Sequence, residues 1–503
     1  MDFIFEIMVS MFNPLTLILI LFGVCVGIFV GAMPGLNGPI GVALLLPLTY
    51  GLSPENGLLM LGGIYMGTGF GGSVSAILLN CPGAGVAACT ALEGYPLALK
   101  GRGKEALYYS VLSSSIGGLV GLLAMIFFTP LLVEVALKFG SAEMFLVAVA
   151  GLAVVGSILG KSPSRGFFAV ALGLLISMVG IDSMAVGKYR LTFGFDSLVP
   201  GIPLIPASVG FFAITEMLTL SRNQSQNIVD VPFQEFTVFQ ALKNIFRKWF
   251  VLAKSCLIGT IVGILPGTGG AIASFVSYGE AKRSAKDHKS FGNGNIEGII
   301  APESSNNAAI GGSFVPMLAL GIPGSATSAI MFGALMIHGL QPGPKLFVEN
   351  AHMAYTFMLG MLLTVICMAI AGILGIPLFS KILKIKTTYI VPTVLVFAMI
   401  GAYSARNNVF DVLLAIIFGF VGVFFKKARI PIAPIILGII LGKITEENFR
   451  RCLVAAAAEG VNVVNYIFLR PLSIILTVFV AVIIFTNFKS LVFAKKMTKN
   501  DAD

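Results

Sequence analysis

Charged residues are scarce in this chain of 503 residues and make up only 11% of it. Hydrophobic residues make up 57%, and the mean hydropathy is +0.95. No soluble core could bury so much apolar surface, so we expect an all-α, polytopic protein of the lipid bilayer. Stretches near the length of a membrane span occur at residues 15–30, 111–129, 144–159, 167–181, 358–379, 391–401, 412–425 and 471–485. With interrupted segments added, roughly 10–12 transmembrane helices are predicted.

Lys and Arg are absent from residues 1–99 and from residues 290–344. The net charge of +10 therefore does not predict a nucleic-acid surface, because the basic residues gather in short loops. Such clusters mark cytoplasmic loops. They are Lys100, Arg102 and Lys104; Lys282, Arg283, Lys286 and Lys289; Lys426, Lys427 and Arg429; and Lys489, Lys495, Lys496 and Lys499 in the tail.

Patterns that would indicate an enzyme or a resident metal are missing. The six cysteines form no CxxC pair, and the three histidines are scattered. The segment GSILGKS at residues 156–162 resembles a phosphate loop, but Val155 stands where the first glycine belongs. We therefore predict neither an enzyme nor a cofactor.

One sequence block occurs twice, and each copy interrupts apolar runs with proline and glycine. The first copy reads GAMPGLNG (31–38) and GGSVSAILLNCPGAG (71–85); the second reads GILPGTGG (263–270) and GGSFVPMLALGIPGSA (311–326). Matched interruptions in two halves are typical of the binding site of a secondary transporter. In the first copy the basic loop follows the second motif, and in the second copy it follows the first motif, so we predict inverted repeats.

This pattern divides the chain into four parts. Residues 1–220 are a first membrane repeat, with broken segments near 31–38 and 68–85. Residues 221–250 are a polar linker and an amphipathic interfacial helix, in which Phe233, Phe236, Phe239, Phe246 and Trp249 recur at helical spacing. Residues 251–487 are a second repeat, with broken segments near 263–270 and 302–328, and residues 488–503 are a basic cytoplasmic tail.

A Pro-Gly pair ends one helical run and leaves backbone N–H groups at the start of the next without partners. Several such helix N-termini aimed at one cavity would favour an anion without any buried Lys or Arg. Hydroxyl, amide and glycine positions around the breaks are the predicted carboxylate-binding residues: Gly35, Asn37, Ser73, Ser75, Asn80, Gly83, Gly267, Thr268, Asn306, Ser313, Gly324, Ser325 and Thr327. The predicted cation-binding residues are Thr68, Gly69, Glu303 and Asn307.

Each of these assignments has a structural alternative. Small residues at four-residue spacing, such as Gly63, Gly67 and Gly71, also let helices pack closely. Glu303 could be a cation ligand or proton carrier at membrane depth, or a residue in the first turn of a helix that faces water. We interpret Glu93 and His338 as helix-terminus residues, and Asp182 and Arg190 as residues that organise a loop.

The motifs together resemble the large membrane subunit of the tripartite tricarboxylate transporters, the TctA type. The resemblance rests on PLTYGL (47–52), YMGTGFGGSVSAILLNCPG (65–83), GIDSMAVGKYRLTFGFDSLVPGI (180–202), FFAITEM (211–217), GILPGTGGAIASFVSYGEAKR (263–283), APESSNNAAIGGSFVPMLALGIPGSATSAI (301–330) and HGLQPGP (338–344). It implies a multi-pass protein of the bacterial inner membrane that imports di- or tricarboxylates such as citrate, coupled to sodium or protons.

The resemblance further implies two partners, a small membrane subunit (TctB type) and a periplasmic solute-binding protein (TctC type). Other classes stay open at this point. An anion channel or an uncoupled carboxylate facilitator could use the same helix N-termini. A membrane scaffold would leave the duplicated breaks unexplained, and the oligomeric state is not readable from the sequence.

Overall fold

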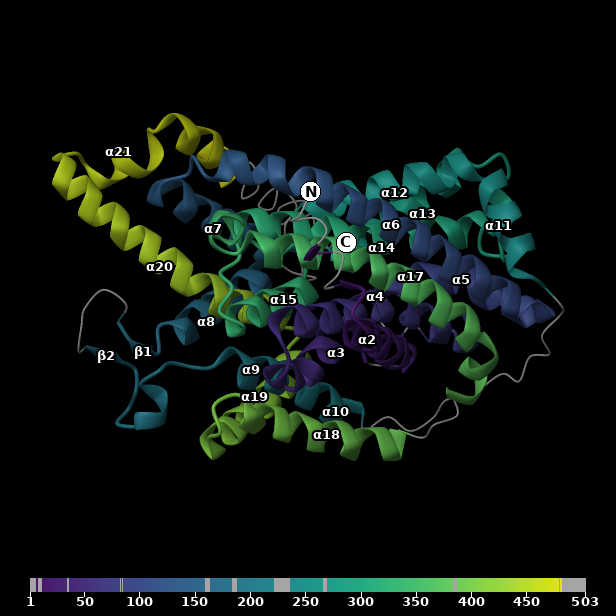
Figure 1. Cartoon of the computed structure of the whole chain (residues 1–503), viewed down its shortest axis with the longest axis horizontal. Helices are drawn as coiled ribbons and strands as arrows, with labels where there is room; N and C mark the ends of the chain where they lie inside the picture. Colours follow the sequence, from purple (N-terminus) through teal and green to yellow (C-terminus); the bar gives the residue numbers. More distant parts are fainter. Residues whose placement is uncertain are drawn as a thin grey trace, which may run out of the picture.

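The computed structural model describes residues 6–7, 11–33, 36–81, 83, 85–158, 163–182, 188–220, 236–265, 269–382, 387–478 and 480–481. Within these ranges the regular structure is helical apart from one small antiparallel sheet, which pairs Gly180 with Arg190 and Ile181 with Tyr189 (Figure 1). The predicted all-α class is thereby confirmed. Four helical stretches are long and apolar enough to cross a membrane: Pro14–Ala32, Gly85–Ala136, Ala351–Phe379 and Val409–Lys427. The larger predicted number of spans stays a prediction.

The first half contains α2 (Pro14–Ala32), α3 (Gly38–Leu45), η1 (Leu46–Gly51), α4 (Pro54–Leu79), η2 (Gly85–Ala87), α5 (Ala88–Leu97), η3 (Ala98–Arg102), α6 (Gly103–Ala136), α7 (Ser141–Ile158), α8 (Pro163–Ser177), β1 (Gly180–Ile181), β2 (Tyr189–Arg190), η4 (Asp196–Leu198), α9 (Leu204–Ser208), η5 (Val209–Ile214) and α10 (Thr215–Leu220).

The second half contains α11 (Val238–Arg247), α12 (Trp249–Ile264), α13 (Gly269–Ser284), η6 (His288–Ser290), α14 (Glu297–Leu320), α15 (Ala326–Ile337), α16 (Pro344–Glu349), α17 (Ala351–Ile382), α18 (Thr387–Ser404), α19 (Val409–Lys427), α20 (Ala433–Glu459) and α21 (Val463–Phe468). The segments 221–235 and 482–503, which include Phe233, most of the predicted linker and the predicted tail, lie outside the described residues.

Helices are interrupted at all four predicted breaks. The first motif of each copy separates α2 from α3 and α12 from α13. The second motif ends α4 at Asn80 and α14 at Gly321, both in the left-handed conformation that closes a helix. The inverted orientation of the two copies stays a prediction.

Glycines bring the central helices into backbone contact. A Cβ added to Gly67 of α4 would lie 2.5 Å from the carbonyl oxygen of Val24 in α2. In the second half, a Cβ on Gly259 of α12 would lie 2.2 Å from the carbonyl oxygen of Ser305 in α14. Gly117 of α6 approaches Ser304 in the same way, at 2.0 Å. These glycines therefore do allow close helix packing, which is the structural alternative given above for the small residues. Through these contacts α14 lies between α6 and α12.

The predicted amphipathic helix is α11. It starts with a capping box between Thr237 and Gln240, buries Ala241 and Ile245, and leaves Phe239 and Phe246 exposed. The only Trp in the chain, Trp249, is 63% exposed and begins α12. Aromatic and basic side chains at this junction fit the boundary between lipid and water.

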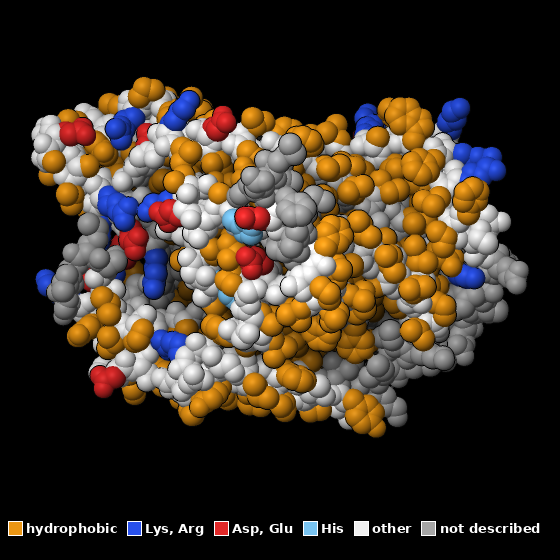
Figure 2. All heavy atoms as spheres, viewed as in Figure 1, with side chains coloured by type: hydrophobic (Ala, Val, Ile, Leu, Met, Phe, Trp, Pro, Cys, Tyr) orange, Lys and Arg blue, Asp and Glu red, His pale blue; other side chains and the backbone are white. Residues whose placement is uncertain are grey.

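Charges mark the two ends of the molecule. Figure 2 shows Lys and Arg gathered at the right-hand end, an apolar stretch beside them, and mixed charges toward the left. On the left, β1, β2 and α20 lie together (Figure 1). There Arg190 pairs with Glu446 at 2.7 Å and Arg450 pairs with Asp182 at 2.6 Å. The predicted loop-organising role of Asp182 and Arg190 is confirmed.

We predict that Gly67→Val lowers the thermal stability of the purified protein, because its side chain would meet the backbone of α2. Overpacking of this kind costs about 1–3 kcal/mol. The measurement is thermal unfolding in detergent, with Gly279→Val as the matched control, since a Cβ at Gly279 of α13 meets nothing within 4 Å. Equal melting temperatures for the two variants would contradict this packing.

Candidate functional site

A cavity of about 320 Å³ lies where the broken segments of both halves meet. Its walls are Asn37, Gly38, Pro39, Tyr65, Thr68, Gly69, Gly85 and Val86 from the first half, and Gly269, Gly270, Ala271, Asn306, Ile310, Ser325, Ala326 and Thr327 from the second. Among these described residues none is charged, so the polarity of the cavity comes from hydroxyl, amide and backbone groups.

Helices begin at this cavity from both halves. Asn37 caps α3, where its Oδ1 accepts from the N–H of Ile40 at 3.3 Å. Ser325 caps α15 through a reciprocal pair with Ser328. Gly269 is the first residue of α13, with φ at +64°, a conformation that glycine adopts readily. The N-termini of α3, α13 and α15 therefore direct partial positive charge and N–H groups toward one space.

Two threonine hydroxyls flank the start of α3. A Cβ at Gly38 would lie 2.8 Å from Thr327 Oγ1 and 3.1 Å from Thr68 Oγ1. Glycine at this position lets one hydroxyl from each half approach the backbone of α3 closely. The hydroxyl of Thr68 donates to the carbonyl of Tyr65 at 2.9 Å, so its lone pairs stay free for a ligand.

Tyr65 is a cavity residue that the sequence analysis missed. Its hydroxyl lies 2.7 Å from Ser325 Oγ and 3.4 Å from Ser313 Oγ, which links α4 to α14 and α15. Tyr65 stands in an apolar helix with no polar neighbour in sequence, and Ser325 is 260 residues away. Nothing local in the sequence signals the pair.

Asn306 and Asn307 face first-half backbone. Asn306 lines the cavity and donates through Nδ2 to the carbonyl of Gly69 at 3.2 Å. Asn307 lies just behind the wall, where its Oδ1 is buried and finds no hydrogen-bond partner among the described residues. A Cβ on Gly69 would lie 2.7 Å from that oxygen. An unsatisfied buried amide oxygen is a group that a small cation could coordinate.

Glu303 lies one helical turn before Asn306 on α14 and is 1% exposed. Its carboxylate accepts hydrogen bonds from Ser73 at 2.5 Å, Ser110 at 2.9 Å and Ser114 at 2.7 Å, and from Thr90. These donors belong to α4, α6 and α5. The alternative of a water-facing residue in the first turn of a helix is thereby excluded.

The other predicted residues lie at or beyond the cavity wall. Ser73 is bound to Glu303, and Ser75 donates to the carbonyl of Gly72. Asn80 is exposed at the end of α4 and does not line the cavity. Gly83 and Gly324 occupy matching positions in the two halves. A Cβ on Gly83 would lie 2.1 Å from the carbonyl oxygen of Gly31, and a Cβ on Gly324 would lie 3.0 Å from the carbonyl oxygen of Gly263. Gly35, Gly267 and Thr268 lie outside the described residues.

The interpretation of Glu93 as a helix-terminus residue is wrong. It is fully buried inside α5, and its carboxylate accepts from the backbone N–H groups of Gly292, Gly294 and Asn295 and from the hydroxyl of Tyr278. The neighbouring Gly94 does not end the helix but makes room for Ile77. His338, by contrast, is the C-cap of α15, as predicted.

Comparison with known proteins places the chain in a family, and the match spans both copies of the repeated block. A model of the tripartite tricarboxylate transporter TctA family matches residues 17–437. This chain belongs to the TctA family. It is therefore the membrane subunit of a tricarboxylate transporter and not an enzyme, and the family name implies a tripartite system.

Two relatives of this TctA family member come from Agrobacterium vitis. One is an uncharacterized 52.8 kDa protein in the TAR-I ttuC' 3' region, 36% identical over 448 residues, which are 89% of each chain. The other is an uncharacterized protein in the TAR-II ttuC' 3' region, 36% identical over 202 residues, which are 40% of this chain and 84% of that one. No solved structure matches this TctA chain.

We predict that Glu303→Ala lowers the free energy of unfolding by about 3 kcal/mol or more, because four buried hydroxyls lose their acceptor. Glu303→Gln, which keeps an acceptor oxygen and the shape, should lose much less. Thermal unfolding in detergent measures both. Glu134→Ala, at an exposed acid of α6, is the control and should leave the melting temperature unchanged. A Glu303→Ala protein as stable as that control would show that the cluster contributes nothing to the fold.

Proposed function

We propose that this chain is the large transmembrane subunit of a binding-protein-dependent secondary transporter of the bacterial inner membrane, which imports di- or tricarboxylates such as citrate. The cavity at the meeting point of the broken segments carries the proposal. It joins three helix N-termini with hydroxyl and amide groups from both halves, and its described walls hold no acid that would repel a carboxylate. A TctB-type small subunit and a TctC-type binding protein complete the system.

We propose that the coupling cation, sodium or a proton, binds between the cavity and Glu303. Thr68 and Gly69 of α4 and Asn307 of α14 supply hydroxyl, carbonyl and amide oxygens there, and Glu303 supplies the negative charge. Sodium favours oxygen ligands of this kind, and a carboxylate can also carry the proton. A cation next to the carboxylate site would lower the electrostatic cost of moving a multiply charged anion.

The contacts between the halves favour movement of both broken blocks as one body. Glu303 of the second half is held by first-half hydroxyls, and Glu93 of the first half holds the backbone of residues 292–295. Rocking of one half against the other would break these bonds. Alternating access by an elevator-like displacement keeps them when α5 and α6 move together with the two blocks against the remaining helices.

Uptake into proteoliposomes tests the proposal. Vesicles that hold this chain and the small subunit receive labelled citrate or succinate, with and without the binding protein and an inward sodium or proton gradient. Saturable accumulation that needs both the gradient and the binding protein supports the proposal. Flux that only equilibrates and is indifferent to either would favour the anion channel or facilitator.

We predict that Tyr65→Phe together with Ser325→Ala raises the KM for the carboxylate about tenfold, because two hydroxyl groups leave the cavity. Ser325→Ala also removes the N-cap of α15, which costs about 1 kcal/mol, so the melting temperature is measured alongside to show that the folded protein is retained. Tyr108→Phe removes the same atom from a residue outside the cavity and is the control. An unchanged KM in the double variant would show that this cavity is not part of the transport path.

We predict that Glu303→Gln raises the sodium or proton concentration needed for half-maximal uptake about tenfold or more, because the negative charge beside the cation is lost. The KM for the carboxylate at saturating cation should change little. Initial rates of uptake at a series of cation concentrations measure this. A variant with wild-type cation dependence would limit Glu303 to its structural role.

A further inference from the structure

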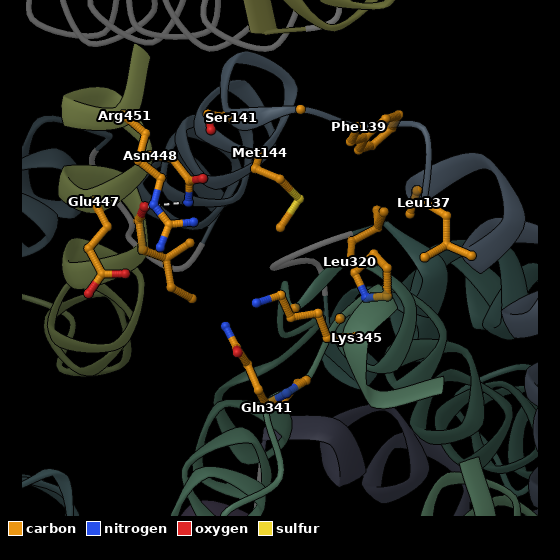
Figure 3. Close-up of a pocket in the computed structure, with 17 residues that line it drawn as sticks. Leu137, Phe139, Ser141, Met144, Leu320, Gln341, Lys345, Glu447, Asn448 and Arg451 are labelled. Atoms are coloured by element: carbon orange, nitrogen blue, oxygen red, sulfur yellow. Dashed lines mark hydrogen bonds between the residues drawn. The ribbon is translucent and has the colours of Figure 1, made fainter. Parts of the chain in front are cut away.

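A second cavity, of about 470 Å³, shares no lining residue with the central cavity between the broken segments. It is enclosed by the turn between α6 and α7, the turn between α15 and α16, the end of α14, and the exposed part of α20 (Figure 3). Its polar walls include Ser141, Gln341, Lys345, Glu447, Asn448 and Arg451. Gln341 belongs to the motif HGLQPGP (338–344), and Lys345 follows it directly; the proposed function gives neither residue a role.

Two basic side chains from different parts of the fold, Lys345 and Arg451, face this space. Figure 3 shows the side chains of Lys345 and Arg451 pointing into the opening from opposite walls, with the amide of Gln341 beside Lys345. Neither cation has an ion pair or a hydrogen bond within the described part of the chain. The adjacent Arg450, by contrast, is paired with Asp182 and Glu446.

The acid in the wall, Glu447, forms no ion pair with either basic side chain among the residues that the structure describes. Glu447 lines the cavity, but its carboxylate turns away from Lys345 and Gln341 in Figure 3. The amide nitrogen of Asn448 already donates to the carbonyl of Ile444 at 2.8 Å, so Asn448 does not add a donor for an anion. The positive charges of Lys345 and Arg451 and the amide nitrogen of Gln341 are the groups available to a small anion, and the cavity is concave enough to hold one.

The location fits the arrival of substrate from outside. The α6 helix starts beside the basic loop that holds Lys100, Arg102 and Lys104, and it ends at Ala136 in the wall of this cavity. Its 34 residues span about 50 Å, enough to cross the bilayer. Since basic loops face the cytoplasm, the cavity opens on the opposite side.

We propose that this outer cavity is a receiving site for a di- or tricarboxylate anion, bound by Lys345 and Arg451 before the anion enters the central cavity. The inference rests on the proposed function. The two sites would bind the anion through different interactions. At the outer site, exposed full charges attract the anion over a distance and release it readily. The central cavity offers helix N-termini and hydroxyl groups, without a fixed positive charge. An outer site of this kind raises the local concentration of the anion at the entrance.

Equilibrium binding of labelled citrate and labelled succinate to the full chain in nanodiscs tests this, without the binding protein. The wild type should show two classes of site, and the outer class should weaken as salt rises. Lys345→Gln with Arg451→Gln should weaken the outer class about a hundredfold, at about tenfold for each cation, and leave the other class unchanged. Lys345→Arg with Arg451→Lys should restore most of the binding.

Lys138→Gln is the matched control, because it removes the same charge from an exposed residue beside the cavity that does not line it. Tyr65→Phe with Ser325→Ala should weaken only the central class. A single class that responds to the Tyr65 and Ser325 variant but not to the Lys345 and Arg451 variant would overturn the outer site and leave the proposed function intact. No binding in either class would overturn the outer site, and the uptake assay with the binding protein would then decide the proposed function separately.

A further result would also overturn the outer site. If citrate and succinate binding is unchanged in the Lys345 and Arg451 variant while uptake that depends on the binding protein falls, the two cations contact the binding protein and not the carboxylate. The melting temperature of each variant, measured alongside, shows that a loss of binding is not a loss of fold.

Discussion

A carboxylate buried as deeply as that of Glu303 is stable only because hydroxyl groups from α4, α5 and α6 donate to it. Those donors belong to the first half of the chain, and the acceptor belongs to the second. The path of α14 between α6 and α12 follows from this requirement together with the glycines that let the backbones touch. Asn306 and Ile310 lie on the same face of α14 as Glu303, beginning one turn farther along the helix. The contacts that position Glu303 therefore also position these two residues in the cavity wall.

Burial of polar groups in lipid also explains why the halves are joined so closely elsewhere. A polar group inside the protein has to find a partner in protein, water or ligand. Glu93 accepts from three backbone N–H groups of the loop before α14, and Asn306 donates to the carbonyl of Gly69 in α4. Each half therefore completes the hydrogen bonding of the other, and the two broken blocks form a single packed unit.

The helix breaks could be predicted from the sequence because proline and glycine act locally. The sequence analysis predicts Asn37 and Ser325 only as carboxylate-binding residues, and the structure adds their roles as helix caps. The pairing of distant side chains could not be predicted: Ser73, a predicted carboxylate-binding residue, donates to Glu303, and the hydroxyl of Tyr65 pairs with Ser325, which lies 260 residues away. Glu93 was misread because a glycine after an acid resembles a helix end, whereas Gly94 is required by the contact with Ile77. Such errors arise wherever a partner lies hundreds of residues away.

The start of α3 between Thr68 and Thr327 has a consequence for how this cavity can change over evolution. A point mutation can delete a hydroxyl or an amide, but it cannot delete a main-chain N–H except through proline. If the cavity binds a carboxylate as proposed, the groups that attract its negative charge are main-chain N–H groups, which persist under substitution. Selectivity between anions would then depend on a few small side chains, which can change while the main-chain groups remain.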